Sequence, residues 1–370
     1  MFLYSLICVL PFTVCLIWSA IFLLDGHGRW TPDRRMLCLF TIVSTLLYLG
    51  HAIHFLDTPA AFSWSDVLYA GANLAVYPLF YLYLKTVADV DGIRRRDWLL
   101  LLPSALVFVF ALVVYLTGGR EEAVRCVFLC NRILFPLTVI YTLVAGQLLL
   151  RRYNKSVNNF YAETEKKTLE DLSVLLILFV VTSLLSTAAS HIGRDAFAHR
   201  FPLAVPSLLF SGLLFSVCYI ASRLPFTAQD MMHDLRQEPG PESEEKSLED
   251  EAVSVSGPHA ELMQRLEAMI REKELFRQQG LKITDLAAMA GTNRTYVSNA
   301  INQQLGLSFS EYINRLRIEE AKRLIRESDG KMVMAAVAEE SGFAGEATFY
   351  RHFRQLEGKT PMEWWQSIEH

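Results

Sequence analysis

Hydrophobic residues follow two different patterns along the 370-residue chain. In residues 1–224 they form long continuous runs, each close to the roughly 20 residues that a helix needs to cross a bilayer. Beyond residue 260 they recur at spacings of three and four, which is typical of short amphipathic helices around a soluble core. The pattern predicts an all-α protein, with a seven-helix transmembrane bundle followed by a helical domain.

Seven apolar runs are predicted to span a membrane: 2–24, 36–56, 65–84, 98–117, 131–150, 172–190 and 203–221. The first run lacks the basic start and the small-residue cleavage site of a signal peptide, so we expect it to be retained. The composition agrees with a membrane domain, because 52% of residues are hydrophobic and the mean hydropathy is +0.25.

The loops between these runs differ in basic residues. Twelve Lys and Arg lie in three loops, 25–35, 85–97 and 151–171. Five lie in the alternate loops, 57–64, 118–132 and 191–202. Because cytoplasmic loops are enriched in Lys and Arg, the N-terminus is predicted outside and residues 222–370 in the cytoplasm.

A few polar side chains fall inside the predicted spans. His51, His54 and Asn73 are candidates for sensing a signal, with interhelical hydrogen bonding as the alternative. No carboxylate or thiol near the two histidines completes a metal site, and we expect no metal or cofactor. Cys126 and Cys130 lie in the 118–132 loop, where either a disulfide or two free thiols would fit.

Residues 225–260 separate the two patterns. They contain Pro-Gly-Pro and nine acidic but only two basic residues, which predicts a flexible acidic linker. The expected domains are therefore 1–224, a transmembrane sensor, the linker 225–260, and 261–370, a cytoplasmic domain.

The cytoplasmic domain is predicted to contain two helix-turn-helix units. An amphipathic helix over 261–278, which is also a candidate dimer interface, precedes a first unit with its turn at Gly291 and with Asn293 as helix N-cap. A long helix, capped by Ser308 or Ser310, leads to a second unit with its turn at Gly342. Two such units on a rigid helix can meet two major-groove segments about 34 Å apart.

Residues 262–367 resemble the DNA-binding domain of the AraC/XylS family of bacterial transcription regulators. The resemblance lies in INRLRIEEAKRLI, in VAEESGF and in FYRHFRQLEGKTPMEWW, at the family's spacings. The whole chain looks like a membrane-tethered regulator of this type. The resemblance implies a multi-pass protein of the bacterial inner membrane that binds double-stranded promoter DNA. A homodimer and RNA polymerase remain open as further partners.

Positions that correspond to the family's reading helices imply the DNA contacts. Base contacts are expected from Arg294, Thr295, Ser298, Asn299, Asn302, Glu346, Ala347, Tyr350 and Arg351. Phosphate contacts are expected from Thr348, Arg354, Lys359 and Thr360. Asn299 has the chemistry to pair with adenine, Arg351 with guanine and Glu346 with cytosine.

These features predict a one-component transcription regulator whose transmembrane domain senses an external or membrane cue, through an unknown signal ligand. The alternative is a transporter or channel with a regulatory tail, for which we would expect internal repeats and charges inside the spans. The sequence has no nucleophile–base set, HExxH motif or Gly-rich phosphate loop. We therefore expect that the protein is not an enzyme and has no catalytic residues. Release of residues 222–370 by proteolysis stays open as a variant.

Overall fold

The structure is a computed structural model that describes residues 2–24, 30–56, 62–191, 204–237 and 257–369. Every regular element in these ranges is a helix, and the described residues contain no strand, as the hydrophobic pattern predicts. The chain divides into two compact units. The first consists of 1–153 and 169–230, and the second of 154–168 and 231–370.

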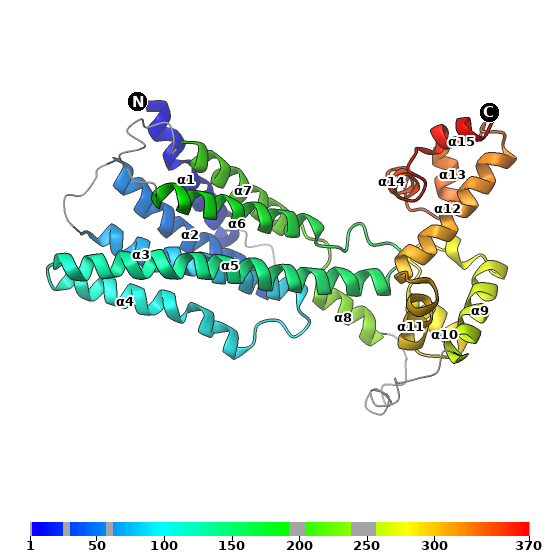
Figure 1. The fold of residues 1–370 in the computed structure, drawn as a ribbon, viewed down its shortest axis with the longest axis horizontal. Coiled ribbons are helices and arrows are strands. Elements are labelled where there is room, and N and C mark those ends of the chain that lie inside the picture. The colour runs from blue at the N-terminus through cyan, green and yellow to red at the C-terminus, as the bar shows by residue number, and fades with distance from the viewer. Residues whose placement is uncertain (1, 25–29, 57–61, 192–203, 238–256, 370) are drawn as a thin grey trace. The chain divides into compact units, whose positions relative to one another are not determined.

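The first unit is a set of long apolar helices that lie side by side (Figure 1). These are α1 (Phe2–Leu24), α2 (Pro32–Leu56), α3 (Trp64–Ala88), the 3-10 helix η1 (Arg95–Leu101), α4 (Leu102–Leu116), α5 (Glu121–Phe160), α6 (Glu170–His191) and α7 (Ala204–Ser222). Helix α3 is the most buried of them and packs between α2 and α4.

Six helices of the described residues are long and apolar enough to cross a membrane, namely Leu6–Leu24, Pro32–Ile53, Trp64–Ala88, Arg95–Leu116, Glu121–Phe160 and Val205–Ser222. Helix α6 covers the predicted sixth span without being one of the six. Helices thus lie at the seven predicted positions, and six of them are long and apolar enough to cross a membrane.

The fifth helix is longer than its predicted span of 131–150. Helix α5 runs for 40 residues from Glu121 to Phe160. Its ends are polar, and an ion pair between Glu121 and Arg125 at the i, i+4 spacing supports the first turns. An apolar run therefore locates the middle of this helix but not its ends. Cys126 and Cys130 both lie on α5 as free thiols.

The second unit is built from shorter helices. Its elements are α8 (Ala228–Gln237), which starts in the first unit, α9 (Gly257–Glu272), the 3-10 helix η4 (Leu275–Arg277), α10 (Ile283–Ala290), α11 (Arg294–Leu305), α12 (Phe309–Glu327), α13 (Met334–Glu340), α14 (Glu346–Glu357) and α15 (Pro361–Glu369). Two parts of the predicted linker are helical, α8 and the first turn of α9. The acidic run at 238–251 lies outside the described residues.

Helix α9 does not offer its apolar face to a second copy of the chain. Met263, Leu266 and Ile270 are buried, and α9 packs against α11 within the second unit. The predicted 261–278 helix also ends earlier, because the chain leaves α9 and forms η4. The apolar side of α9 thus belongs to the core of the second unit, and a dimer interface on this helix stays a prediction.

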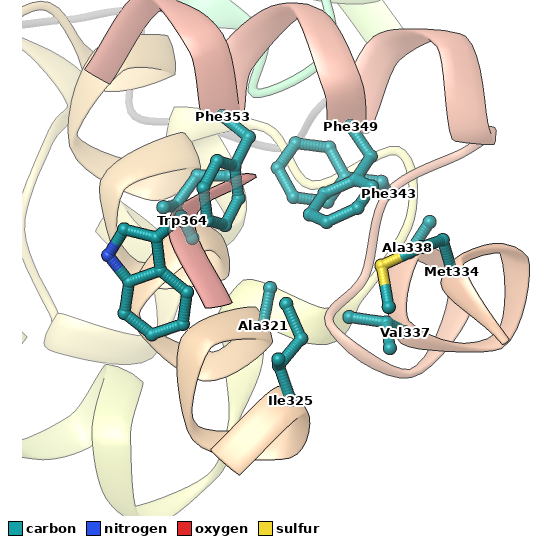
Figure 2. Close-up of a cluster of buried hydrophobic side chains, with 10 residues drawn as sticks. Ala321, Ile325, Met334, Val337, Ala338, Phe343, Phe349, Phe353 and Trp364 are labelled. Carbon is teal, nitrogen blue, oxygen red and sulfur yellow. The ribbon is translucent and has the colours of Figure 1, made fainter. Parts of the chain in front are cut away.

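The C-terminal half of the second unit has a core rich in aromatic side chains (Figure 2). Phe349 and Phe353 of α14 lie with Phe343 and with Trp364 of α15. They face residues of α12 and α13, among them Ala321, Ile325, Met334, Val337 and Ala338. Phe353 and Trp364 meet edge to face with ring centroids 5.8 Å apart. Trp364 is thus a core residue.

Gly342 joins this core to η4. It adopts a φ of +92°, which side chains of L-residues rarely allow. A Cβ atom built there would lie 2.6 Å from Cα of Arg277 and 2.8 Å from the carbonyl oxygen of Phe276. The turn after α13 can therefore rest on the η4 backbone only because residue 342 has no side chain.

Gly342→Ala is expected to destabilise the second unit by about 2–4 kcal/mol, from backbone strain and from overlap with η4. Native-state hydrogen exchange on the full-length protein would measure the free energy of opening of α12. Gly345→Ser is the matched control, because Gly345 has an extended backbone and no atom near the site of a Cβ. Equal stability of the two variants would contradict the contact between the turn and η4.

Candidate nucleic-acid interface

Helices α10 and α11 form the first helix pair, joined by a short turn. Gly291 ends α10 with a left-handed φ of +65°. Asn293 caps α11, since its side-chain oxygen accepts the N–H of Tyr296 at 3.0 Å. Both features agree with the sequence prediction. On α11, Val297, Ala300 and Ile301 are buried, so the opposite side faces outward.

The outward side of α11 carries the predicted base-contact residues. Thr295, Asn299 and Asn302 are exposed, while Arg294 and Ser298 are half-buried. Four of these five side chains are uncharged hydrogen-bonding groups. This helix can therefore read base edges but brings little charge to the phosphates.

Helices α13 and α14 form the second helix pair. Phe349 and Phe353 fix the buried side of α14. Glu346, Ala347 and Arg351 are exposed on the other side. Tyr350 is half-buried and packs against the aromatic core, with its ring 5.6 Å from that of Phe349. The Tyr350 side chain thus packs partly against the core and is partly exposed at the surface.

Three of the four predicted phosphate contacts lie near the C-terminal end of α14, and the fourth, Thr348, lies in its first turn. Arg354 and Lys359 are exposed, and Thr348 is half-buried. Thr360 has a local role, because its hydroxyl accepts the N–H of Glu363 at 3.3 Å while the Glu363 carboxylate accepts the N–H of Thr360 at 2.8 Å. This reciprocal pair caps α15. The Thr360 hydroxyl therefore already has a partner at the start of that helix.

One side chain that sequence reasoning missed lies against the second helix pair. The Glu165 carboxylate is 2.7 Å from Nη2 of Arg351 and 3.2 Å from Nε2 of His352. Sequence reasoning used the 151–171 loop only for its basic residues. The signal that could have found this contact is the presence of acidic residues, Glu163 and Glu165 among them, in the same loop.

The partners of Glu165 favour the ionised form of its carboxyl group. Burial alone would raise the pKa of this carboxyl, but the hydrogen bond with His352 and the charge of Arg351 lower it below its ordinary value. Because the pKa is lowered in the folded state, the contact stabilises that state above the ordinary pKa of a carboxyl and loses its effect in acid. Glu165 is thus an anion at neutral pH.

The predicted sensing residues lie in the first unit. Asn73 is buried, and its amide donates to Oδ1 of Asn131 at 2.9 Å. The Asn131 amide in turn donates to the carbonyl oxygen of Ala70 at 2.9 Å. Asn73 therefore links α3 to α5, as the alternative of interhelical hydrogen bonding predicts.

The two histidines of α2 differ from Asn73. The His51 ring is exposed and meets the Tyr69 ring edge to face at 5.0 Å. The side chain of His54 lies outside the described residues. Within the described part of the chain, no group of three or more His, Cys, Asp and Glu could hold a metal ion.

Comparison with known proteins identifies the second unit. Residues 286–367 match the model of one family, a helix-turn-helix domain. The uncharacterized HTH-type transcriptional regulator YisR of Bacillus subtilis is 37% identical over 82 residues, 22% of this chain and 28% of that protein. Residues 286–367 are a helix-turn-helix domain of the AraC type. Regulators with this domain bind DNA and are typically not enzymes.

Further relatives share only the same region. The uncharacterized HTH-type transcriptional regulator YtdP of Bacillus subtilis is 33% identical over 81 residues, 22% of this chain and 10% of that protein. An uncharacterized HTH-type transcriptional regulator of Staphylococcus aureus is 28% identical over 91 residues, 25% of this chain and 12% of that protein. The chain thus spans less than a third of the length of these curated relatives. No solved structure matches it.

Asn73→Ala and Asn131→Ala are each expected to destabilise the first unit by about 1 kcal/mol, the usual range for an interhelical hydrogen bond between apolar helices. The double variant is expected to cost less than the sum, because both substitutions remove the same bond. Denaturation of the full-length protein in mixed micelles would measure the three free energies. Strictly additive losses would contradict a direct Asn73–Asn131 bond.

Proposed function

We propose that the protein is a membrane-bound one-component transcription regulator, with two helix-turn-helix units that bind promoter DNA sequence-specifically. The observation that carries the proposal is the form of α11 and α14. Each has a fully buried apolar side and an outward side of hydrogen-bonding or basic residues, within an AraC-type domain. The helix pairs α10–α11 and α13–α14 are the two units, and α12 joins them.

The two reading helices have different chemistry in this proposal. Asn299 of α11 pairs with adenine, and Arg351 of α14 with guanine. Thr295, Asn302 and Glu346 add further base contacts, while Arg354 and Lys359 hold phosphates. Each good bidentate base contact contributes about 1–3 kcal/mol of discrimination between bases.

The apolar first unit is the membrane sensor in this proposal. Two observations support the orientation derived from the basic loops. Residues 154–168, from a loop with many basic residues, belong to the same compact unit as the helix-turn-helix domain. Two helices, α6 and α7, separate this loop from residue 231, and an even number of crossings returns the chain to the same side. In this proposal the DNA-binding unit and the 151–171 loop lie on the same side of the membrane, which the basic residues of the loop assign to the cytoplasm.

The charge of the cytoplasmic domain limits how it holds DNA. Residues 261–370 contain 15 Lys and Arg against 16 Asp and Glu, so non-specific attraction to phosphates is weak. We infer that two copies act together at a promoter, because a dimer doubles the base contacts. The remaining partners in the proposal are the lipid bilayer, a signal ligand and RNA polymerase.

Genome-wide DNA occupancy of the tagged full-length protein is expected to give discrete promoter peaks. These peaks are expected to disappear in an Asn299→Ala/Arg351→Ala variant, which removes one base contact from each reading helix. The matched control is Gln304→Ala/Gln355→Ala, because both glutamines are exposed on the same two helices outside the predicted contact set. Absence of peaks from the membrane-inserted wild type would refute the DNA-binding proposal.

Labelling of Cys126 tests the orientation in the membrane. Cys126 is the exposed thiol among the cysteines of the described residues, and it lies in a loop predicted outside. A membrane-impermeant maleimide is expected to label it in intact cells, and Cys126→Ser is expected to abolish the labelling. Lys166→Cys, made in the Cys126→Ser background, is expected to react only after permeabilisation. The opposite pattern would invert the topology.

A further inference from the structure

The segment Tyr161–Thr168, called here the docking loop, connects α5 to α6 and yet packs within the second unit. The proposed sensor and the DNA-binding unit are thus linked twice along the chain, once through residues 222–260 and once through this loop. The docking loop has two halves with different environments.

The first half is anchored by buried backbone contacts. The N–H of Ala162 donates to the carbonyl oxygen of Leu281 at 3.0 Å, and the carbonyl oxygen of Ala162 accepts the Ser310 hydroxyl at 2.9 Å. The N–H of Gly280 donates to the Glu163 carboxylate at 2.7 Å. Ser310, one of the two predicted caps of α12, is used for this contact, and Ser308 is the cap instead.

Glu163 also neutralises a buried charge. Arg317 of α12 is fully buried, and its Nη2 lies 2.9 Å from Oε1 of Glu163. Its guanidinium donates further to the carbonyl oxygens of Phe276 at 2.6 Å and Gln278 at 3.0 Å. Removing Glu163 would leave a buried cation without a counter-charge, which is strongly unfavourable. The first half of the loop is therefore a permanent part of the second unit.

The second half of the loop contacts α14 through Glu165, which lies beside Arg351 and His352. The Arg351 side chain is 56% exposed and Glu165 is 21% exposed, so this ion pair is accessible to solvent. Such a pair contributes little stability and can exchange for another anion. The loop thus has a strong anchor beside α12 and a weak contact on the second reading helix.

The weak contact occupies the Arg351 guanidinium, which is the group proposed to bind DNA. A carboxylate offers two hydrogen-bond acceptors to an arginine, as a guanine edge does with O6 and N7 and a phosphate does with its oxygens. Arg351 is exposed on α14, and the Nη2 atom that donates to Glu165 is part of the fork that would address a base. Glu165 and DNA therefore compete for one guanidinium.

We propose that Glu165 is an internal competitor of DNA at the second reading helix, and that the docking loop conveys the arrangement of α5 and α6 to this helix. The inference rests on the proposed DNA-binding function. DNA binding at α14 requires Glu165 to leave Arg351 while Ala162 and Glu163 stay in place. A signal that moves α5 relative to α6 shifts the loop and changes the affinity for DNA.

The test compares two variants of the full-length protein in lipid nanodiscs. Glu165→Gln keeps the shape of the side chain but removes its charge. Glu170→Gln is the matched control, because it makes the same change of net charge at an exposed position of α6, five residues further along. The dissociation constant for a DNA fragment from an occupancy peak is measured at one fixed salt concentration.

Glu165→Gln is expected to bind the fragment about twofold to fivefold more tightly than wild type, the range for loss of a competing partly exposed ion pair. Glu170→Gln is expected to bind like wild type. Equal affinities of the two variants, or weaker binding by Glu165→Gln, would overturn the inference while leaving DNA binding intact. If wild type binds no better than the Asn299→Ala/Arg351→Ala variant, the DNA-binding proposal itself fails, and the inference with it.

Hydrogen exchange provides a second readout on the wild-type protein. The amides of Lys167 and Thr168 donate to the carbonyl oxygen of Thr164 at 2.9 and 3.0 Å. They are expected to exchange faster when the DNA fragment is added, because Glu165 no longer holds this turn on α14. The Ala162 amide in the anchor is expected to keep its protection. Unchanged exchange at Lys167 and Thr168 would contradict displacement of the loop by DNA.

Discussion

The second unit is arranged around the buried positive charge of Arg317. Its guanidinium binds the carbonyl oxygens of Phe276 and Gln278 beside η4, the Glu163 carboxylate, and the face of the Phe343 ring at 5.8 Å. These partners come from the segment before the first helix pair, from the docking loop, and from the turn of the second pair. Since a buried cation needs all its compensation nearby, the two helix pairs and the loop have to assemble together. Burial accordingly lowers the pKa of Arg317, while the charge of Glu163 opposes that shift.

This constraint explains why the structure of the second unit depends on Gly342, which has no side chain, and on Glu163, which lies in a loop. Gly342 lets the second turn rest on the backbone of Phe276 and Arg277, next to the carbonyl that Arg317 binds. Glu163 binds Arg317 and the N–H of Gly280 with its two carboxylate oxygens. The relative placement of α11 and α14, on which the proposed two-site DNA recognition depends, thus rests on a few contacts to one side chain of α12.

The hydrophobic pattern was enough to predict the helices and the outward sides of α11 and α14, because helical periodicity and capping are local properties. Asn293 and Gly291 have the predicted roles for that reason. The pattern failed where a tertiary contact decides. The apolar side of α9 covers α11, helix α5 continues through polar residues to Phe160, and Glu165 lies against Arg351 from 186 residues away. No local signal determines which of several acidic residues will neutralise a distant arginine.

The proposed competition sets a limit on how strongly this protein can switch. A partly exposed pair such as Glu165–Arg351 contributes at most about 1 kcal/mol, which changes a binding constant about fivefold. Moving a population from 1:99 to 99:1 needs about 5.5 kcal/mol, so loss of this pair alone cannot act as an all-or-none switch. Two copies at one promoter would each contribute their pair, and the effects multiply in the affinity of the dimer. Positive and negative charges are nearly balanced in residues 261–370, so non-specific attraction to DNA is weak and does not mask this small difference in affinity. We therefore expect a graded response to the signal rather than an abrupt one.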